Sequence, residues 1–405
     1  MNLGILRETI AGERRVAVVP ATVPMLAKAG FAVFLEQGAG VSAGFPDEAF
    51  VAAGATVATR GDVLKRADHL LAVRLPSDPR APHAEIAALA RSGRTLFGLA
   101  EPLSGSSRLR ELAATGVTAF AIELLPRITR AQSMDVLSSQ ATIAGYKAVL
   151  LAAAQLDRMM PMMMTAAGTL AATRVLVLGA GVAGLQALAT AKRLGAVTSG
   201  YDIRAAAAEQ VKSVGAKFVD LGLEASGEGS GGYAKAMDEA FYGEQRSRLG
   251  AVAAEHEVVI TTAAVPGRPA PKLLTAEAVR AMPLGSIVVD LAAERGGNCE
   301  LTKPGESVEV DGRRVIGPID LASTVPHHAS LMYARNLAAF LTLFAKAGTP
   351  ALVGGDADPA ADEILRDTLL CRDGALASPT VRARLGTSSA SLVETLPVSA
   401  KGVLT

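Results

Sequence analysis

The sequence contains no tryptophan, and aromatic residues make up only 4% of its 405 residues. Because hydrophobic residues still account for 50% of the chain, the core must consist mainly of Ala, Val, Leu and Met. The chain also lacks an excess of either charge, since 40 basic residues face 39 acidic ones and the net charge is +1. Nucleic-acid binders normally carry a clear basic excess, so we expect no nucleic-acid partner.

Cysteine is almost absent as well. Cys299 and Cys371 have no spacing typical of a metal site, and two cysteines are too few for a secreted disulfide scaffold. We therefore expect no metal and a reducing, cytoplasmic setting. The N-terminal apolar stretch is short and is followed at once by charges, unlike a signal peptide. No run of 18 or more apolar residues occurs, so no membrane-spanning segment is expected.

Two stretches of the chain alternate short apolar runs with Ala- and Leu-rich segments. In the first, the predicted strands are 3–6, 32–35, 70–73, 95–97 and 117–120, and the predicted helices are 22–29 and 82–91. In the second, from 174 to about 314, the predicted strands are 175–178, 196–198, 258–260 and 287–289. Strand, helix and strand at this spacing predict parallel, doubly wound sheets.

Three segments depart from this alternation. A long helix is predicted at 135–156, and the Met-rich run that follows it, 159–164, is interpreted as flexible core filler. The glycine-rich segment 221–243 interrupts the second stretch, and a loop of this length is usually functional or disordered. A third segment, 329–347, predicts an amphipathic helix with an apolar face that we expect to pack on the first stretch.

The predicted fold class is therefore α/β, with two Rossmann-like, doubly wound parallel-sheet domains and a cleft between them. The first domain is expected to be discontinuous, comprising 1–134 and 328–380, and the second to comprise 135–327. The remainder, 381–405, is rich in Ser, Ala and Thr and is expected to be a flexible tail.

A glycine motif in the second domain predicts a dinucleotide site. The run 179–184, Gly-Ala-Gly-Val-Ala-Gly, follows a predicted strand and opens a predicted helix, and Asp202 closes the next strand. This combination is the full dinucleotide fingerprint. Gly179 permits the tight turn, Gly181 admits the pyrophosphate, and Gly184 lets helix and strand pack closely. The alternative is a glycine turn in an ordinary α/β unit.

Asp202 also bears on the choice of nucleotide. A carboxylate at this position binds the ribose hydroxyls and repels a 2′-phosphate, so NAD(H) is favoured over NADP(H). Arg204 lies two residues further on and is compatible with a phosphate. We expect it instead to stack near the adenine or to face solvent.

The segment 126–140 links the two stretches and is unusually polar. It contains two Arg, two Gln, one Asp and three Ser, and its place between the domains puts it at the cleft. The alternative is a purely structural role, with Ser133 or Asp135 capping the helix that follows.

Several motifs together resemble the NAD(H)-binding component, domain I, of proton-translocating transhydrogenases. These motifs are the segments 127–146, 162–169, 179–186, 260–271 and 288–298. The opening, Arg7-Glu8 with 13–17, is shared with that family and with the related alanine dehydrogenases. The resemblance covers roughly residues 1–380, and the 127–146 segment is very specific to transhydrogenases.

The resemblance implies roles for individual residues. Arg127, Asp135 and Ser138 would hold the nicotinamide end of NAD(H), Gln132 would reach toward a second nucleotide, and Tyr233 would lie on a mobile loop that closes over NAD(H). The residues expected to contact the nucleotide are Arg127, Gln132, Ser138, Gly179, Gly181, Val182, Ala183, Gly184, Asp202, Ile203, Arg204, Tyr233, Thr262, Ala263 and Ala264.

The resemblance also implies partners and a location. NADP(H) would be the second substrate, held by an NADP-binding transhydrogenase subunit, and a small transmembrane subunit would carry the proton pathway. The chain would form a homodimer and lie in the cytoplasm, peripheral to the inner membrane through these partners.

The alternative enzyme is an alanine dehydrogenase, which reduces an imine and needs proton transfer. Where that family places a Lys for substrate, a catalytic His and a catalytic Asp, this chain has Arg74, Glu101 and Glu294. None of the five histidines lies near Glu101; they are His69, His83, His256, His327 and His328. The general acid is therefore missing. Hydride transfer between two nicotinamides needs no such acid, which favours the transhydrogenase.

Overall fold

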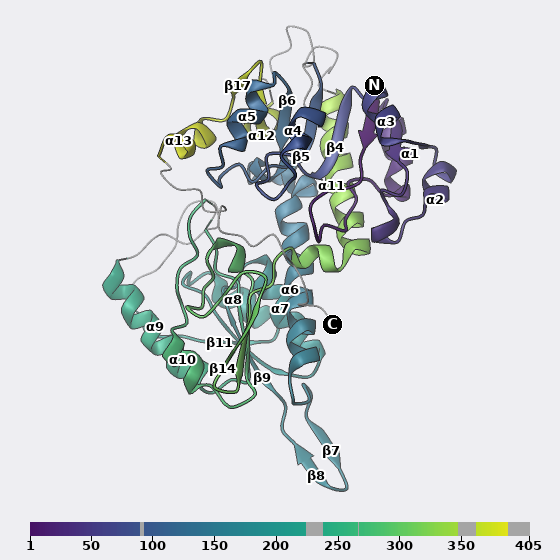
Figure 1. Ribbon diagram of the computed structural model, residues 1–405. Coiled ribbons are helices and arrows are strands. Elements are labelled where there is room, and N and C mark those ends of the chain that lie inside the picture. Colours follow the sequence, from purple (N-terminus) through teal and green to yellow (C-terminus); the bar gives the residue numbers. More distant parts are fainter. Residues whose placement is uncertain (90–92, 224–237, 266, 347–361, 388–405) are drawn as a thin grey trace. The chain divides into compact units, whose positions relative to one another are not determined.

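The computed structural model describes residues 1–89, 93–223, 238–265, 267–346 and 362–387 (Figure 1). These residues form two compact units: unit 1 comprises 1–140 and the described part of 322–398, and unit 2 comprises 141–321. Each unit contains a mostly parallel sheet covered by helices. The predicted α/β class with two doubly wound sheets is therefore confirmed.

Unit 1 contains an eight-stranded sheet in the order β17-β16-β6-β5-β4-β1-β2-β3. The strands are β1 (Asn2–Ile5), β2 (Ala32–Glu36), β3 (Thr56–Ala58), β4 (His69–Arg74), β5 (Thr95–Leu99), β6 (Thr118–Ala121), β16 (Leu369–Arg372) and β17 (Ala375–Leu376). Strands β1 to β6 pair in parallel, whereas β16 adds antiparallel to β6. Strands that are covered on both faces need near-continuous apolar runs. Such runs are visible in the sequence, so the strands predicted for unit 1 match strands of its sheet.

The helices of unit 1 cover both faces of this sheet. They are α1 (Val23–Lys28), α2 (Asp47–Ala52), α3 (Arg60–Arg66), α4 (Ala84–Leu89), α5 (Arg108–Ala114), α11 (Pro326–Lys346), α12 (Glu363–Thr368) and α13 (Pro379–Thr387). The apolar face of α11 belongs to the same core as β1 and β2, and its Tyr333, Phe340 and Phe344 are fully buried. The helix expected at 329–347 therefore packs on the N-terminal sheet.

Unit 2 contains a seven-stranded sheet in the order β11-β10-β9-β12-β13-β15-β14. The strands are β9 (Arg174–Leu178), β10 (Val197–Tyr201), β11 (Lys217–Phe218), β12 (Val258–Thr261), β13 (Ile287–Asp290), β14 (Ser307–Val310) and β15 (Arg313–Ile316). Only β14 runs antiparallel to its neighbour. The helices are α7 (Val182–Arg193), α8 (Ala207–Ser213), α9 (Glu239–Ala253) and α10 (Ala276–Ala281).

Helix α6 (Val136–Gln155) crosses the division between the units at residue 140. Its Ala148, Val149 and Ala152 are buried in the core of unit 2. Among the described residues, this helix alone is long and apolar enough to span a membrane by length and composition. Core helices of soluble proteins pass the same test, and the burial of these three residues explains the composition.

The interpretation of the Met-rich run as core filler is wrong for most of it. Residues Met163–Thr165 and Gly168–Leu170 form a two-stranded hairpin, β7–β8, which projects from unit 2 (Figure 1). Met162 and Met164 are 62% and 76% exposed, whereas Met160 is buried. The side chains of a lone two-stranded ribbon have no second layer to pack against, so this segment presents apolar surface to its surroundings.

Two other expectations concern loops and the tail. Residues 379–387 form α13, in which Val381 is buried against the core of unit 1, so the predicted loose tail does not begin at 381. The remainder of that tail, 388–405, lies outside the described residues. Tyr233 and most of the glycine-rich segment around it also lie outside them.

Candidate functional site

The glycine motif of unit 2 lies where the strand order of its sheet reverses. From β9 the chain continues to β10 on one side, while β12 flanks β9 on the other. Residues 179–181 follow β9, and α7 begins at Val182. In open α/β sheets this carboxyl edge is where ligands bind, with the free N–H groups of the helix start available to a phosphate.

The three motif glycines meet different surroundings. Gly179 has φ 102°, and a Cβ there would lie 2.6 Å from the Thr262 Oγ1. A Cβ on Gly184 would lie 1.8 Å from the Gly179 carbonyl oxygen. A Cβ on Gly181 would meet no atom of the described chain within 4 Å, and its φ is −78°. The packing of the protein requires Gly179 and Gly184, whereas Gly181 leaves open space beside the helix start.

A fourth glycine supports this helix from the other side. Gly145 of α6 lies against the first turn of α7, and a Cβ at Gly145 would be 2.1 Å from the Ala183 carbonyl oxygen. The two helices therefore approach each other backbone to backbone, which fixes the place of the α7 start. The sequence analysis did not predict this contact, although Gly145 lies within the helix predicted at 135–156.

Asp202 follows β10 and faces the glycine turn. Its Oδ2 accepts from the Ala180 N–H at 2.8 Å, and its Oδ1 accepts from the Arg204 backbone N–H at 2.9 Å. The Arg204 guanidinium donates to both carboxylate oxygens, each at 2.9 Å. Because a carboxylate offers about four acceptor positions, Asp202 must release the Arg204 side chain before it can bind two ribose hydroxyls. Ile203 lies between them and is half-buried.

The predicted residues Thr262, Ala263 and Ala264 follow β12, at the same edge of the sheet. The Thr262 hydroxyl donates to the Gly179 carbonyl oxygen at 2.8 Å, so it ties this loop to the glycine turn. Buried Asn298 accepts from the Ala263 N–H at 3.0 Å and donates to the Ala263 carbonyl at 2.7 Å. Sequence reasoning did not assign Asn298 a role.

Unit 1 carries the other predicted site residues. Arg127 precedes the short helix η4 (Thr129–Met134), which includes Gln132, and both residues are exposed. Asp135 follows η4 and caps the start of α6, because Ser138 donates to it twice: its N–H to Oδ1 at 2.9 Å and its hydroxyl to Oδ2 at 2.6 Å. The capping role considered for Asp135 is therefore present, and it joins two of the predicted site residues.

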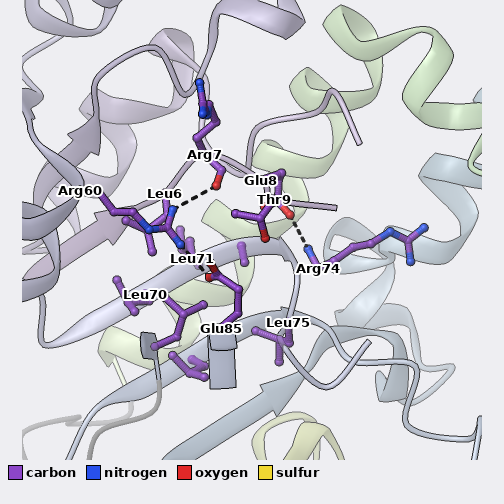
Figure 2. A pocket seen from close by; sticks show the side chains of 13 residues that line it. Leu6, Arg7, Glu8, Thr9, Arg60, Leu70, Leu71, Arg74, Leu75 and Glu85 are labelled. Atoms are coloured by element: carbon purple, nitrogen blue, oxygen red, sulfur yellow. Dashed lines mark hydrogen bonds and ion pairs between the residues drawn. The ribbon is translucent and has the colours of Figure 1, made fainter. Parts of the chain in front are cut away.

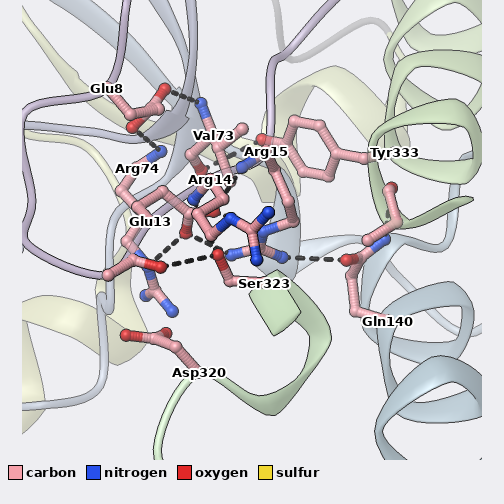
Figure 3. Close-up of polar contacts among 12 residues, drawn as sticks. Glu8, Glu13, Arg14, Arg15, Val73, Arg74, Gln140, Asp320, Ser323 and Tyr333 are labelled. Atoms are coloured by element: carbon pink, nitrogen blue, oxygen red, sulfur yellow. Dashed lines mark hydrogen bonds and ion pairs between the residues drawn. The ribbon is translucent and has the colours of Figure 1, made fainter. Parts of the chain in front are cut away.

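A buried ionic cluster, which sequence reasoning did not predict, lies in unit 1 and bonds to Gln140 near the start of α6 (Figure 3). Arg15 donates to both oxygens of Glu13, at 2.8 and 2.6 Å. Arg74 contacts Glu13 at 3.2 Å, Asp78 at 3.1 Å and Glu101 at 3.8 Å. Burial alone would raise the pKa of Glu13, but Arg15 and Arg74 hold it well below its usual value.

The alanine dehydrogenase alternative depends on Arg74, Glu101 and Glu294. Three carboxylates already surround Arg74, and Glu294 accepts from the Asp320 N–H at 2.7 Å within unit 2. Beside Glu101, Glu123 accepts the N–H groups of Ala100 and Glu101. Burial and then the charge of Glu101 raise the pKa of Glu123 to about 8. The three positions on which this alternative depends, Arg74, Glu101 and Glu294, are therefore all engaged in ion pairs or hydrogen bonds within the protein.

The corresponding edge of the unit 1 sheet holds a small pocket (Figure 2). It lies beside Leu6–Thr9, after β1, and beside Ala72 and Arg74 of β4. Arg60 crosses it and donates to Glu36 and Glu85 at 2.9 and 2.7 Å. The pocket has a volume of about 30 Å³, whereas small-molecule sites usually have about 300–1,000 Å³. It has no room for a dinucleotide.

Comparison with known proteins places both halves of the chain in one family. The N-terminal domain model of the alanine dehydrogenase/PNT family matches residues 4–144, and its C-terminal domain model matches residues 148–379. The chain is 44% identical over 384 residues to the first of the separate parts of NAD(P) transhydrogenase subunit alpha from Rhodospirillum rubrum. That alignment covers 94% of this chain and 99% of the relative.

Solved structures agree with this match. The transhydrogenase from Sinorhizobium meliloti superimposes with a TM-score of 0.80 at 42% identity, covering 94% of this chain and 99% of that one. An L-alanine dehydrogenase superimposes with a TM-score of 0.76 at 24% identity, covering 95% and 99%. At that identity the second likeness concerns the fold alone.

Proposed function

Because the chain belongs to the alanine dehydrogenase/PNT family, we propose that it is the NAD(H)-binding subunit of a proton-translocating NAD(P) transhydrogenase. Gly181 is the observation that carries this proposal. The other two motif glycines, Gly179 and Gly184, are required because a Cβ there would clash with the protein, whereas beside Gly181 there is space that a nucleotide pyrophosphate would fill. Gly179, Gly181, Val182, Ala183 and Gly184 would hold the phosphates, and Asp202, Ile203 and Arg204 the adenosine end.

In this proposal, hydride passes from C4 of NADH, bound here, to C4 of NADP⁺, bound on a partner subunit, and leaves NAD⁺ and NADPH. Arg127, Asp135 and Ser138 orient the nicotinamide, and Gln132 reaches toward the second ring. Thr262, Ala263 and Ala264, which follow β12, contact the bound nucleotide, and the predicted contact from Tyr233 lies outside the described residues. No acid or base is required, so catalysis comes from positioning and the exclusion of water.

The partner assignments belong to the same proposal. A second subunit holds NADP(H), and a small transmembrane subunit carries the proton pathway and keeps this cytoplasmic chain peripheral to the inner membrane. The chain's similarity to a relative whose name describes one piece of a divided alpha subunit supports a divided enzyme. The small volume of the unit 1 pocket is consistent with it, because that pocket has no room for the second nucleotide.

The test is reconstitution with the soluble NADP-binding domain of a transhydrogenase. The chain alone should bind NADH but transfer essentially no hydride to NADP⁺, because one site of this preference cannot hold both nucleotides. With the added domain, stopped-flow absorbance should show rapid transfer without any membrane, since the hydride step moves no proton between compartments. Full-speed transfer by the isolated chain would contradict the subunit assignment.

The same preparation distinguishes the rival amino-acid dehydrogenase. With pyruvate, ammonia and NADH, we expect turnover at background, since Arg74 is already bonded to carboxylates and no histidine is near Glu101 in the sequence. A rate of NADH oxidation well above background would contradict the proposal and indicate an amino-acid dehydrogenase instead.

We also propose that the chain forms a homodimer and that a second copy covers the β7–β8 hairpin. The hairpin exposes Met164 and Leu170, of which Leu170 is 50% exposed, and Met162 just before it is exposed as well. An apolar ribbon of this kind is stable only when something packs on it. Met164→Lys should therefore shift the chain toward monomer by at least tenfold in dissociation constant, as measured by sedimentation. A wild-type chain that sediments as a monomer at micromolar concentration would refute the dimer.

A further inference from the structure

The segment 132–140, in which Gln132, Asp135 and Ser138 lie, is bonded to α11 at two points. The Asn336 Nδ2 donates to the Ser133 carbonyl oxygen at 2.8 Å. The Gln140 Nε2 donates to the Ala329 carbonyl oxygen at 3.1 Å. Both bonds lie within unit 1, and together they span the start of α6. Asp135 and Ser138 lie between these two points, and Gln132 immediately precedes the first of them.

The buried side-chain amide of Asn336 lowers the stability of the fold. The residue is only 9% exposed, and its Oδ1 is buried without a hydrogen-bond partner in the described part of the chain. Around it, α11 contributes Leu337, Phe340 and Leu341 to an apolar core. An isosteric leucine would suit such surroundings better, since a buried polar atom without a partner destabilises a fold. The bond to Ser133, next to Gln132, is what the amide provides.

Gln140 is fixed by the ionic cluster described above. Its Oε1 accepts from the Arg15 Nη1 at 2.8 Å, and Arg15 is itself held by both oxygens of Glu13 (Figure 3). Arg15 is 4% exposed, so its guanidinium is not free to change partners with solvent. The Gln140 amide is thus anchored at its oxygen and holds α11 with its nitrogen.

We propose that Asn336 and Gln140 are positioning residues that hold the 132–140 segment in register for hydride transfer. This inference rests on the proposed function, in which Gln132 reaches from this segment toward the second nicotinamide. Gln132 is exposed, so its own side chain has little to fix it and its place follows from the backbone beneath it. A misplacement of about 1 Å can slow a positioned reaction about a hundredfold, so loss of one of the two bonds should slow it about tenfold.

Asn336→Leu is the decisive variant. It keeps the shape of the side chain and removes both the bond to Ser133 and the buried orphan oxygen. Transfer from NADH to NADP⁺, with the NADP-binding domain saturating, should fall about tenfold. NADH affinity should stay within about twofold, and the melting temperature should not fall. Gln140→Leu should likewise lower the transfer rate and leave NADH affinity nearly unchanged.

Ser330→Ala is the matched control on the same helix. Ser330 is fully buried and accepts from the Val16 N–H at 3.0 Å, and it is neither of the two α11 residues that bond to the 132–140 segment. Its loss should lower the melting temperature and leave the transfer rate unchanged. Wild-type transfer in Asn336→Leu, or a rate that falls only in step with melting temperature or NADH affinity, would overturn the positioning role.

Hydrogen exchange separates this inference from the proposed function. In the isolated chain, Asn336→Leu should speed exchange of the 132–139 amides severalfold, and Ser330→Ala should not. If the wild-type chain transfers no hydride with the added domain, the proposed function fails, yet exchange still shows whether Asn336 holds the segment. Unchanged exchange in Asn336→Leu would overturn the inference whatever the transfer assay gives.

Discussion

Gln132→Asn should slow hydride transfer about a hundredfold while NADH affinity stays within about twofold of the wild-type value. Gln132 is exposed on η4, and the adjacent Ser133 carbonyl is fixed by Asn336. The backbone therefore cannot follow a shorter side chain, and the amide group falls short by about 1 Å, a displacement that can cost about a hundredfold in rate. Stopped-flow transfer with the NADP-binding domain, and NADH titration by fluorescence, measure the two effects separately.

Ser133→Ala is the control for this variant. Ser133 is an exposed neighbour on the same short helix, and the alanine keeps the carbonyl that Asn336 holds. Its transfer rate should match the wild type. If Gln132→Asn instead loses NADH affinity and rate equally, Gln132 is a ligand of NAD(H) and does not reach the second nucleotide.

Asp202→Ala should weaken NADH binding about tenfold or more, and NADPH binding should not fall in parallel. A charge-assisted bond to the ribose hydroxyls contributes about 1.5–3 kcal/mol, and removing the carboxylate also removes its repulsion of a 2′-phosphate. Fluorescence titration with each nucleotide decides the matter. Equal losses for both nucleotides would contradict the role of Asp202 in selecting NAD(H).

Two further variants separate the ribose contact from the structural bonds of Asp202. Asp202→Asn keeps an oxygen that can accept from the Ala180 N–H, so it tests the charge without opening the glycine turn. Arg204→Ala removes the guanidinium that occupies both carboxylate oxygens. Its effect on NADH affinity should be smaller than that of Asp202→Ala, because the carboxylate then needs no rearrangement before it binds ribose.

The sequence predicted the two parallel sheets because their strands are enclosed on both faces and read as continuous apolar runs. It did not predict β16, which joins the unit 1 sheet antiparallel to β6 and far from it in sequence. Asp373-Gly374 between β16 and β17 is a hairpin signal that could have indicated these strands. The β7–β8 hairpin was mistaken for core because methionine composition alone does not distinguish a packed chain from an exposed ribbon.

The glycine turn of the candidate site followed from local spacing, whereas the supports around it did not. Glu13, Arg74 and Gln140 are distant in sequence and come together only in the fold, so no local motif predicts their cluster. Asn336 likewise is buried beside the apolar face of α11, where a sequence pattern treats a single polar residue as a tolerated exception. Such residues act through hydrogen bonds and ion pairs with residues distant in sequence. The local sequence does not indicate which of these pairs form.

The contact between Gly145 and Ala183 limits how this protein can be engineered. Helix glycines are routine targets for stabilisation, because alanine in a helix interior is favoured over glycine by about 1 kcal/mol. At position 145 the added methyl would overlap the carbonyl of Ala183, and relief of that overlap would move the start of α7. Replacing every helical glycine by alanine would therefore raise local helix propensity but displace the turn beside Gly181.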